Sequence, residues 1–511
     1  MLTRKHSIAL AALIFVGLCF RLYGLSAESL WFDEAFTIKF ARLDLFEIFL
    51  RRETNPPLYN MIMHVWINFF GDSEFSIRFP SVVFGVLSLF VIYKTGSRMF
   101  NKNVGLLAAL LLGISVFHIR NSQEARNYSL LALITLLSMY FFIQLLKDVR
   151  PKILLGYLFF SFLLTYSHIY GLFIIFSQNM YMGCLFLFAR QTTIISIKKW
   201  IFCQLGLLFL FLPWFVILIN RLLFVQTDGW WLMEPDIYSV FQSFRLYSNN
   251  KQFVLFIFLA AALFSIISLK TNPKVKEQKL FLKLISICPA KDRLENIQKI
   301  GLLFFWLLTP IVIPYLISLF VTPLYHTRYT IVVVPAFYLL VSKGLDTLKG
   351  KYLKLLVICI IVVFSLQPIW QYHTKVKKAQ WREVVSYLDK NALKSDLFLF
   401  RPFVCKEILF NYYSRRDGLI MEKAFIKKGF SETGFFEKAI DPLIDRLDDQ
   451  YLEELGESLQ NHKRVWVVIP LMKSIDKSLK KKLSESFKLS LHRKYKGGID
   501  LYFFEKKLER P

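Results

Sequence analysis

Long apolar segments separated by short, mostly basic loops recur along this chain of 511 residues. Hydrophobic residues make up 55% of the sequence, which is too apolar for an ordinary soluble domain. A helix needs about 20 predominantly apolar residues to cross the hydrocarbon core of a bilayer, and many segments here approach that length. The sequence therefore predicts a polytopic α-helical membrane protein.

The order of the apolar segments predicts about eleven transmembrane helices. We expect them at Ser7–Tyr23, Phe79–Ile92, Val104–Phe117, Tyr128–Leu146, Ile153–Tyr166, Gly171–Phe188, Trp200–Phe224, Phe253–Leu269, Leu302–Val321, Thr330–Val341 and Tyr352–Ile369. Basic residues gather in alternate loops, and the positive-inside rule places those loops in the cytoplasm. These loops explain most of the net charge of +27, so no nucleic-acid partner is predicted.

Two segments near the N-terminus depart from a simple series of spans. Ser7–Tyr23 follows a basic cluster, contains Arg21 and lacks a clear small-residue cleavage site, so we expect a retained signal anchor. Pro56–Phe70 is short, carries several polar residues and is followed by charged ones, so we expect an interfacial or re-entrant segment. The first outer loop then extends over residues 25–78.

The composition becomes charged and mixed after Ile369, which divides the chain into a transmembrane domain, residues 1–370, and an extracytoplasmic α/β domain, residues 371–511. In the second domain we expect helices at Trp381–Leu388 and Leu452–Leu459, strands at Leu397–Phe400, Val465–Ile469, Lys488–Leu491 and Leu501–Phe504, and a hairpin turn at Gly497-Gly498. No glycine-rich phosphate loop or nucleophile elbow occurs there, so we expect this domain to serve in recognition or support.

A Lys-rich loop from Lys270 to Lys299 is expected on the inner side of the membrane. Its apolar residues recur at near-helical spacing and alternate with lysines, a pattern typical of a helix that lies on an anionic leaflet. We expect this loop to anchor the protein to membrane lipids and not to carry chemistry.

Asp33 and Glu34 are adjacent carboxylates within the aromatic run Leu30–Phe36, which follows the first apolar segment. Carboxylates are costly to remove from water, so a pair set among Trp and Phe needs a specific role. One interpretation is structural: Asp33 caps an amphipathic helix that continues through Phe49, with Glu34 in its first turn. The other is catalytic: the pair supplies a general base at the membrane surface. The two interpretations are compatible.

Other charged residues gather near the outer ends of the predicted spans. They are Arg78, Arg120, Glu124, Arg126, Arg245 and Arg328, with His168 and His326 nearby. For a single arginine, contact with lipid headgroups or with a carboxylate is a sufficient explanation. Several arginines on one face, beside two carboxylates and many aromatic residues, indicate transfer from a lipid-linked phosphosugar. The carboxylate would deprotonate the acceptor hydroxyl, and the planar guanidinium groups would hold the departing phosphate.

The linear order of several motifs resembles the family 39-like glycosyltransferases. These include bacterial relatives of the dolichyl-phosphate-mannose protein mannosyltransferases and of the lipid A aminoarabinose transferases. The similar stretches are Trp31–Ala35, Asn55–Tyr59, Gly71–Ser81, Ser122–Tyr128 and Arg328-Tyr329, together with Trp381–Val384, which resembles the opening of the outer domain in such proteins. The resemblance covers residues 1 to about 345 and, weakly, the remainder.

This resemblance implies a GT-C architecture, a polyprenyl-phosphate sugar donor, inversion at the anomeric carbon and a catalytic aspartate in the first outer loop. By position that aspartate is Asp33. The resemblance also implies that Glu34 assists or orients the acceptor and that three arginines lie near the donor phosphate: Arg126, Arg78 and Arg328. The residues expected to shape the pocket are Glu124, Tyr128, His168, His326 and Tyr329.

The resemblance leaves cofactor use open. Many relatives have His before the Pro-Pro pair, whereas Asn55 stands there in this chain, which removes a candidate metal ligand or proton carrier. The six cysteines form no disulfide framework or metal-type pair. We therefore assign no metal site and no cofactor, although a divalent metal is compatible with the family.

The function that this sequence predicts best is a multi-pass glycosyltransferase of the cell (inner) membrane, acting on a lipid, glycan or protein acceptor at the outer face. A lipid-linked oligosaccharide flippase or other transporter is the first alternative, but it would place charges near the middle of the membrane. A receptor or scaffold that displays the C-terminal domain is the second, and it gives Asp33 and Glu34 no role.

Overall fold

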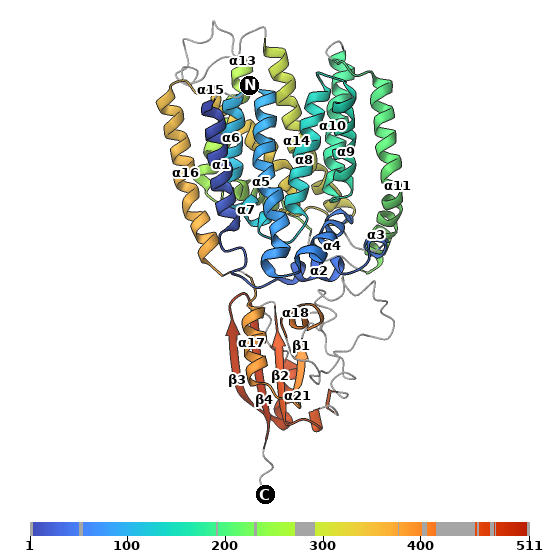
Figure 1. Cartoon of the computed structure of the whole chain (residues 1–511), viewed down its shortest axis with the longest axis vertical. Helices are drawn as coiled ribbons and strands as arrows, with labels where there is room; N and C mark the ends of the chain where they lie inside the picture. The colour runs from blue at the N-terminus through green and yellow to red at the C-terminus, as the bar shows by residue number, and fades with distance from the viewer. Residues whose placement is uncertain are drawn as a thin grey trace.

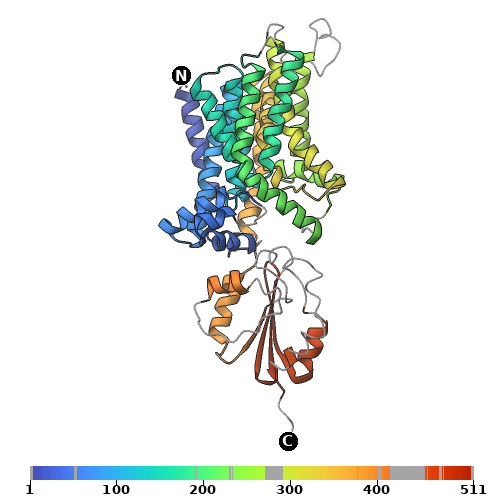
Figure 2. The same cartoon turned by 90° about the vertical axis from the view of Figure 1, so that its right-hand side faces the viewer.

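The computed structural model describes residues 4–50, 55–190, 193–228, 232, 234–270, 292–376, 378–400, 406–414, 455–456, 459–470, 475 and 477–507. A bundle of long helices forms one part of the molecule, and a small domain built on a β-sheet lies beyond one end of the bundle (Figure 1). Figure 2 shows the same two parts from the side. The last bundle helix leads directly into the sheet domain.

The bundle is formed from the following elements in chain order. They are α1 (Arg4–Leu22), α2 (Phe32–Ala41), α3 (Leu45–Leu50), α4 (Leu58–Phe70), α5 (Glu74–Met99), α6 (Lys102–Gly113), α7 (Val116–Ser122), α8 (Tyr128–Leu145), α9 (Pro151–Thr165), α10 (Tyr170–Phe188), α11 (Ile197–Asp228), α12 (Ile237–Tyr247), α13 (Gln252–Lys270), α14 (Arg293–Phe320), η5 (Tyr329–Val333), α15 (Val334–Thr347) and α16 (Lys351–Thr374). Most of their buried apolar side chains form one continuous core, and a small separate cluster joins Tyr166, at the end of α9, to α11.

In the described part of the chain, eight helices are long and apolar enough to cross a membrane, or up to ten if each of two bent pairs counts as one span. The short helix α9 is apolar but has only 15 residues. All eleven predicted segments coincide with helices, and the expected number of about eleven is reached only when α9 is included. The polytopic helical fold is therefore confirmed, while three of the predicted spans are short or bent.

The two bent pairs differ from the straight spans that were expected. α6 and α7 meet at 65°, and α12 and α13 meet at 90°. The first bend follows from Ser115, whose hydroxyl accepts a hydrogen bond from the His118 backbone N–H at 3.3 Å and so starts a new helix. As a result, the predicted span Val104–Phe117 ends earlier, at Gly113, and α7 turns aside at the end of the bundle.

Three short helices, α2, α3 and α4, lie at the end of the bundle that faces the sheet domain (Figure 1). α4 has 13 residues and is not among the helices that can span a membrane, as predicted for Pro56–Phe70. The expected single helix through Phe49 is instead two, because the chain breaks after α2 and Asp44 caps α3 by accepting a hydrogen bond from the Glu47 N–H at 2.8 Å.

The C-terminal domain begins after α16 with α17 (Trp381–Asn391). Its other elements are β1 (Leu397–Phe400), η6 (Lys406–Phe410), α18 (Asn411–Tyr413), β2 (Arg464–Ile469), α21 (Lys477–Ser486), β3 (Phe487–Tyr495) and β4 (Ile499–Lys506). The strand order is β1-β2-β4-β3, with β1 parallel to β2 and the other two pairs antiparallel. All four strands overlap the ranges that the sequence predicted for them.

Side chains alternate across this sheet and bury both faces. Phe398, Phe400 and Val468 belong to the core that contains α17, whereas Leu399 and Val467 belong to the core that contains α21. Figure 2 shows these two helices on opposite sides of the sheet. The β3–β4 hairpin turns at Gly497 and Gly498, which both have positive φ, as the predicted hairpin turn requires.

Two sequence-based predictions fall outside this description. The expected helix in the Lys-rich loop lies outside the described residues, and so does most of Leu452–Leu459.

The charge distribution predicts the orientation of the bundle, and cysteine accessibility measures it. The exposed Ser395 lies in the C-terminal domain, whereas the exposed Lys349 lies between α15 and α16, at the opposite end of the bundle. In a variant that lacks the native cysteines, Ser395→Cys should react with an impermeant maleimide in intact cells, and Lys349→Cys only after lysis. Equal reactivity at both positions, or the reverse order, would contradict the predicted orientation.

Candidate active site

The site begins at the first turn of α2, which carries both predicted carboxylates. Trp31 occupies the N-cap position and the helix starts at Phe32, so Asp33 is not the cap residue and the capping interpretation is wrong. Asp33 and Glu34 instead both lie in the first turn, where the helix dipole favours negative charge. Because they are consecutive, their side chains point in directions about 100° apart around the helix axis.

Glu34 is completely buried and is held by charges from two other parts of the chain. Its carboxylate pairs with Arg78 of α5 at 2.8 Å and with Lys378, between α16 and α17, at 3.0 Å. It also accepts a hydrogen bond from the Ala125 N–H at 3.0 Å. Burial alone would raise the pKa of Glu34, but Lys378, Arg78 and these hydrogen bonds outweigh it and hold the pKa at about 2.

All five N–H groups of the Arg78 guanidinium are engaged inside the protein. The Nε–H and one N–H of Nη2 donate to the two carboxylate oxygens of Glu34, each at 2.8 Å. The other three N–H groups donate to the backbone carbonyls of Leu25, Glu28 and Ser29, at 2.7, 2.9 and 3.1 Å. The side chain is 1% exposed. Arg78 thus has no N–H group left over for the predicted contact with the donor phosphate, and it fixes the loop between α1 and α2.

Asp33 differs from Glu34 in being accessible, with 34% of its side chain exposed. Its carboxylate lies 3.6 Å from the Arg328 guanidinium. That guanidinium in turn lies over the rings of Trp31 and Tyr128, with centroid distances of 4.7 and 5.6 Å. Of the two adjacent carboxylates, Asp33 alone is therefore placed to meet a substrate.

The predicted Ser122–Tyr128 motif docks directly onto α2. Ala125 accepts a hydrogen bond from the Thr37 hydroxyl at 2.9 Å and donates its N–H to Glu34. Next to it, the Arg126 guanidinium donates to the Asp33 carbonyl at 3.4 Å. These contacts bring the positive charge of Arg126 close to the backbone of Asp33.

Glu124 belongs to the same motif and links two arginines. It is almost fully buried, pairs with Arg120 at 3.0 Å and has its second oxygen 3.9 Å from Arg328. Within the described residues, that second oxygen accepts no hydrogen bond. Glu124 is therefore suited to orient Arg328 toward Asp33, or to accept a hydrogen bond from a hydroxyl group of a bound ligand.

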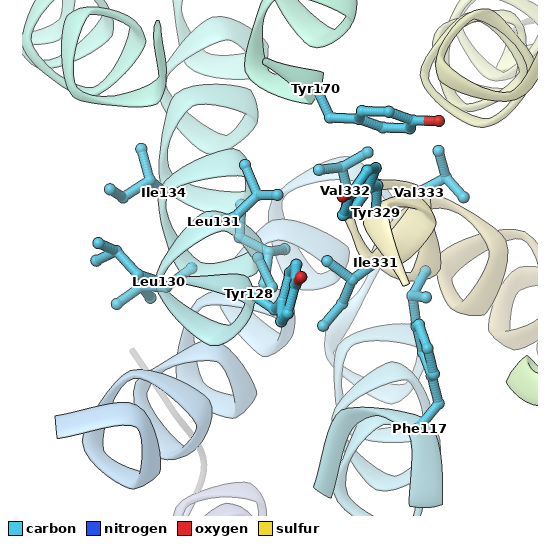
Figure 3. Close-up of a cluster of buried hydrophobic side chains, with 14 of the residues drawn as sticks. Phe117, Tyr128, Leu130, Leu131, Ile134, Tyr170, Tyr329, Ile331, Val332 and Val333 are labelled. Carbon is cyan, nitrogen blue, oxygen red and sulfur yellow. The ribbon is translucent and has the colours of Figure 1, made fainter. Parts of the chain in front are cut away.

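Aromatic side chains form the wall of the site nearest the bundle core. Tyr128 and Tyr329 stack with centroids 6.1 Å apart, and Tyr170 lies edge-on to Tyr329 at 5.5 Å; Figure 3 shows these three rings together. His168 and His326 contact Tyr329 with centroid distances of 4.5 and 5.1 Å. The apolar residues of α8 and η5 pack behind these rings.

Both histidines are held neutral. Burial first, then nearby arginine charges, lowers the pKa of His168 to about 3 and that of His326 to about 4. The Nδ1 atoms accept backbone hydrogen bonds, from Tyr170 at 3.1 Å and from Arg328 at 3.2 Å. The proton of each neutral ring is thereby assigned to Nε2, which makes these residues hydrogen-bond donors and not proton carriers near neutral pH.

The structure thus brings together eight of the ten predicted site residues around Asp33 and sets Glu34 and Arg78 apart in a buried ion cluster. Sequence reasoning missed two contributors, Trp31 beneath Arg328 and Lys378 beside Glu34. The position of Trp31 next to the carboxylates was an available signal. Nothing in the sequence marks Lys378, because it is 344 positions away from its partner.

The other face of α2 borders a separate cavity of about 880 Å³ between the bundle and the C-terminal domain. Ala35 and Ile38 line it from α2, and Tyr412 and Tyr413 from the other side, whereas Asp33 is not among its lining residues. Across the described part of the chain, no group of three or more His, Cys, Asp or Glu side chains is arranged to hold a metal ion.

Comparison with known proteins finds one family that matches part of the chain. The family described as dolichyl-phosphate-mannose-protein mannosyltransferase matches residues 54–217, which include the Ser122–Tyr128 motif and His168 but not Asp33 or Arg328. No curated protein sequence matches the chain significantly.

Solved structures extend the likeness to nearly the whole chain. The apo structure of ArnT from Cupriavidus metallidurans is 12% identical with a TM-score of 0.61, and it covers 97% of each chain. The same enzyme bound to undecaprenyl phosphate is 10% identical with a TM-score of 0.57 and the same coverage. The apo oligosaccharyltransferase from Archaeoglobus fulgidus is 12% identical with a TM-score of 0.53, and it covers 90% of this chain and 69% of its own.

These TM-scores show a shared fold. The chain has the GT-C architecture, with a helical membrane part and a small C-terminal sheet domain. Together, the family match over residues 54–217 and this architecture indicate a membrane-bound glycosyltransferase.

Replacing Glu34 tests the buried ion cluster. Glu34→Gln should destabilise the protein by about 3–5 kcal/mol, because it leaves Arg78 and Lys378 largely buried without a counter-charge. Since the pKa of Glu34 is lowered from 4.5 to about 2, the wild-type advantage should be complete above pH 4.5 and decline as the pH falls from 4.5 toward 2. Thermal unfolding of purified protein between pH 7 and pH 2.5 measures both effects.

The matched control for this prediction is Glu47→Gln, an exposed glutamate on the neighbouring helix α3. It should change the unfolding temperature little at any pH. A shift for Glu34→Gln no larger than that of the control would contradict the cluster.

Proposed function

We propose that this protein transfers a sugar from a polyprenyl-phosphate carrier to a hydroxyl of a lipid, glycan or protein acceptor, with inversion at the anomeric carbon. The observation that carries the proposal is the setting of Asp33: one accessible carboxylate beside two guanidinium groups, Arg328 and Arg126, at the end of a membrane bundle. A base next to anion-binding groups is what displacement of a phosphate by a hydroxyl requires.

Two proteins of similar fold support the class of donor and acceptor. ArnT from Cupriavidus metallidurans has been solved with undecaprenyl phosphate bound, and the Archaeoglobus fulgidus oligosaccharyltransferase with a tethered acceptor peptide. By analogy, the donor of this chain carries its sugar on a lipid phosphate.

The reaction proposed here has one bond-forming and one bond-breaking event. The acceptor oxygen forms a bond to the anomeric carbon while the bond from that carbon to the phosphate oxygen breaks. Asp33 takes the acceptor proton as the oxygen becomes bonded. The polyprenyl phosphate leaves with the bonding electrons, and Arg328 and Arg126 stabilise its growing negative charge.

The remaining site residues are proposed to shape the pocket. Tyr128 and Tyr329 offer flat apolar faces against which a sugar ring packs, and His168, which contacts the Tyr329 ring, supports this wall. Glu124 and His326 flank Arg328 and set its orientation. Glu34 is reassigned from an acceptor-orienting role to holding α2 in place.

The location of this site follows from the charge distribution. The basic loops predict that the end of the bundle carrying Asp33, together with the C-terminal domain of residues 371–511, lies outside the cell (inner) membrane. Polyprenyl-phosphate sugars presented at that surface would reach Asp33 from the bilayer, and the acceptor would approach from the aqueous side.

Asp33→Asn tests the general base directly. The amide has the same shape but cannot accept the proton, so transfer should fall by about 10²–10⁴-fold while expression and donor binding persist. The assay is transfer from a radiolabelled polyprenyl-phosphate sugar, with each variant normalised to folded protein. Asp72→Asn, which changes a carboxylate paired with Arg42 at the surface, is the matched control and should retain activity. Wild-type transfer by Asp33→Asn would remove Asp33 from the mechanism.

Arg328→Gln tests the phosphate contact. Charge-assisted hydrogen bonds contribute about 1.5–3 kcal/mol, so the variant should bind undecaprenyl phosphate about 10- to 100-fold more weakly and also react more slowly. Arg126→Ala should show the same pattern. Arg42→Gln, at an arginine that is 62% exposed, is the control. Unchanged affinity in both site variants would place the phosphate elsewhere.

A further inference from the structure

The C-terminal domain forms several hydrogen bonds with the loop that leads into α2. The Arg382 side chain donates to the Ser26 carbonyl at 3.0 Å, and its backbone N–H donates to the Ser29 hydroxyl at 3.2 Å. The Tyr413 hydroxyl accepts a hydrogen bond from the Leu30 N–H at 2.7 Å. These contacts continue up to the residue before Trp31, so the loop is fixed by the sheet domain as well as by the bundle.

Lys378 adds an ion pair with α2 itself to these contacts. Its ammonium group lies 3.0 Å from the Glu34 oxygen that also accepts a hydrogen bond from Arg78, and its side chain is only 14% exposed. The residue also donates its backbone N–H to Glu28 at 3.4 Å. A charge brought by the second domain therefore contacts the residue adjacent to Asp33, inside a cluster that is shielded from solvent.

The β3–β4 hairpin fixes the backbone that carries Lys378. A Cβ atom at Gly497 would lie 2.3 Å from the Lys378 carbonyl oxygen, so the turn and this backbone are in direct contact. Beside them, the Lys496 N–H donates to the Gln380 side chain at 2.8 Å, and the Gln380 N–H donates back to the Lys496 carbonyl at 3.3 Å. The position of Lys378 is thus set by the sheet and not by α16 alone.

We propose that Lys378 is a positioning residue for sugar transfer: it holds Glu34, and through Glu34 the first turn of α2, so that Asp33 faces Arg328. This inference rests on the proposed function. Lys378 touches no substrate in this arrangement, since it lies in the buried cluster, on a different side of α2 from Asp33. Loss of its ion pair would let the first turn shift, and small displacements of a general base reduce the rate of the chemical step more than substrate binding.

The first experiment separates positioning from binding. Lys378→Met keeps the length of the side chain but removes its charge, and it should lower kcat about tenfold or more while leaving the KM for the polyprenyl-phosphate sugar nearly unchanged. Lys378→Arg retains a cation and should restore most of the rate. Each rate is normalised to folded protein, so that misfolding lowers the amount of active enzyme and not the measured kcat.

A second variant displaces the backbone of Lys378 without changing its side chain. Gly497→Ala places a methyl group against the Lys378 carbonyl and should reproduce the loss in kcat. Its matched control is Gly350→Ala, at another glycine of positive φ whose added Cβ would meet only Leu353, at 3.9 Å. Both glycines have positive φ, so both substitutions strain the backbone, but only the first lies beside Lys378.

Running wild type and Asp33→Asn in the same assay separates a failure of the proposed function from a failure of the role proposed for Lys378. If wild type is inactive, or as active as Asp33→Asn, the proposed function fails and the role of Lys378 falls with it. If wild type is active and Asp33→Asn is not, then full kcat in Lys378→Met overturns this inference alone. An equal loss in Gly497→Ala and Gly350→Ala, or a change confined to KM, also overturns it. Should Lys378→Met fail to fold, Gly497→Ala decides the question.

Discussion

The buried carboxylate of Glu34 is the interaction on which the arrangement of the site depends. Removing a charge from water is expensive, and it is tolerated only when counter-charges and hydrogen bonds replace the lost solvent. Glu34 obtains these from α5 through Arg78, from the second domain through Lys378, and from the Ala125 backbone. Four segments that are far apart in sequence must therefore meet at one point, and α2 is held where they do.

Burial of Glu34 also separates the roles of two neighbouring residues that look equivalent in sequence. With Glu34 committed to the interior, the helical step of about 100° turns Asp33 toward Arg328 and leaves about a third of its side chain exposed. The docked Ser122–Tyr128 motif then adds Arg126 and Glu124 to the same side. A structural carboxylate thus fixes the setting in which its neighbour is available for chemistry.

The sequence was most informative where a periodic pattern repeats over many residues. Long apolar runs located the spans, and short runs rich in apolar residues located all four strands. It was less informative where one side chain changes the course of the backbone: Ser115 starts a new helix and bends the third predicted span, and Asp44 divides a helix that looked continuous. These effects depend on single hydrogen bonds, which periodicity does not reveal.

Site residues were predicted from their type and their position along the chain. The structure places three of them, Asp33, Arg126 and Arg328, next to one another. Type and position could not distinguish Arg78 from the other arginines, because only the three-dimensional contacts show that all five of its N–H groups are engaged. Lys378 could not be predicted, since its role follows from the docking of a hairpin on a distant segment. The most direct measurement of the central claim is a cryo-EM structure of the full chain with undecaprenyl phosphate. The account predicts the phosphate within hydrogen-bonding distance of Arg328 or Arg126, beside Asp33 and against the Tyr128 and Tyr329 rings. A phosphate bound in the cavity on the other face of α2, or at the opposite end of the bundle, would contradict it.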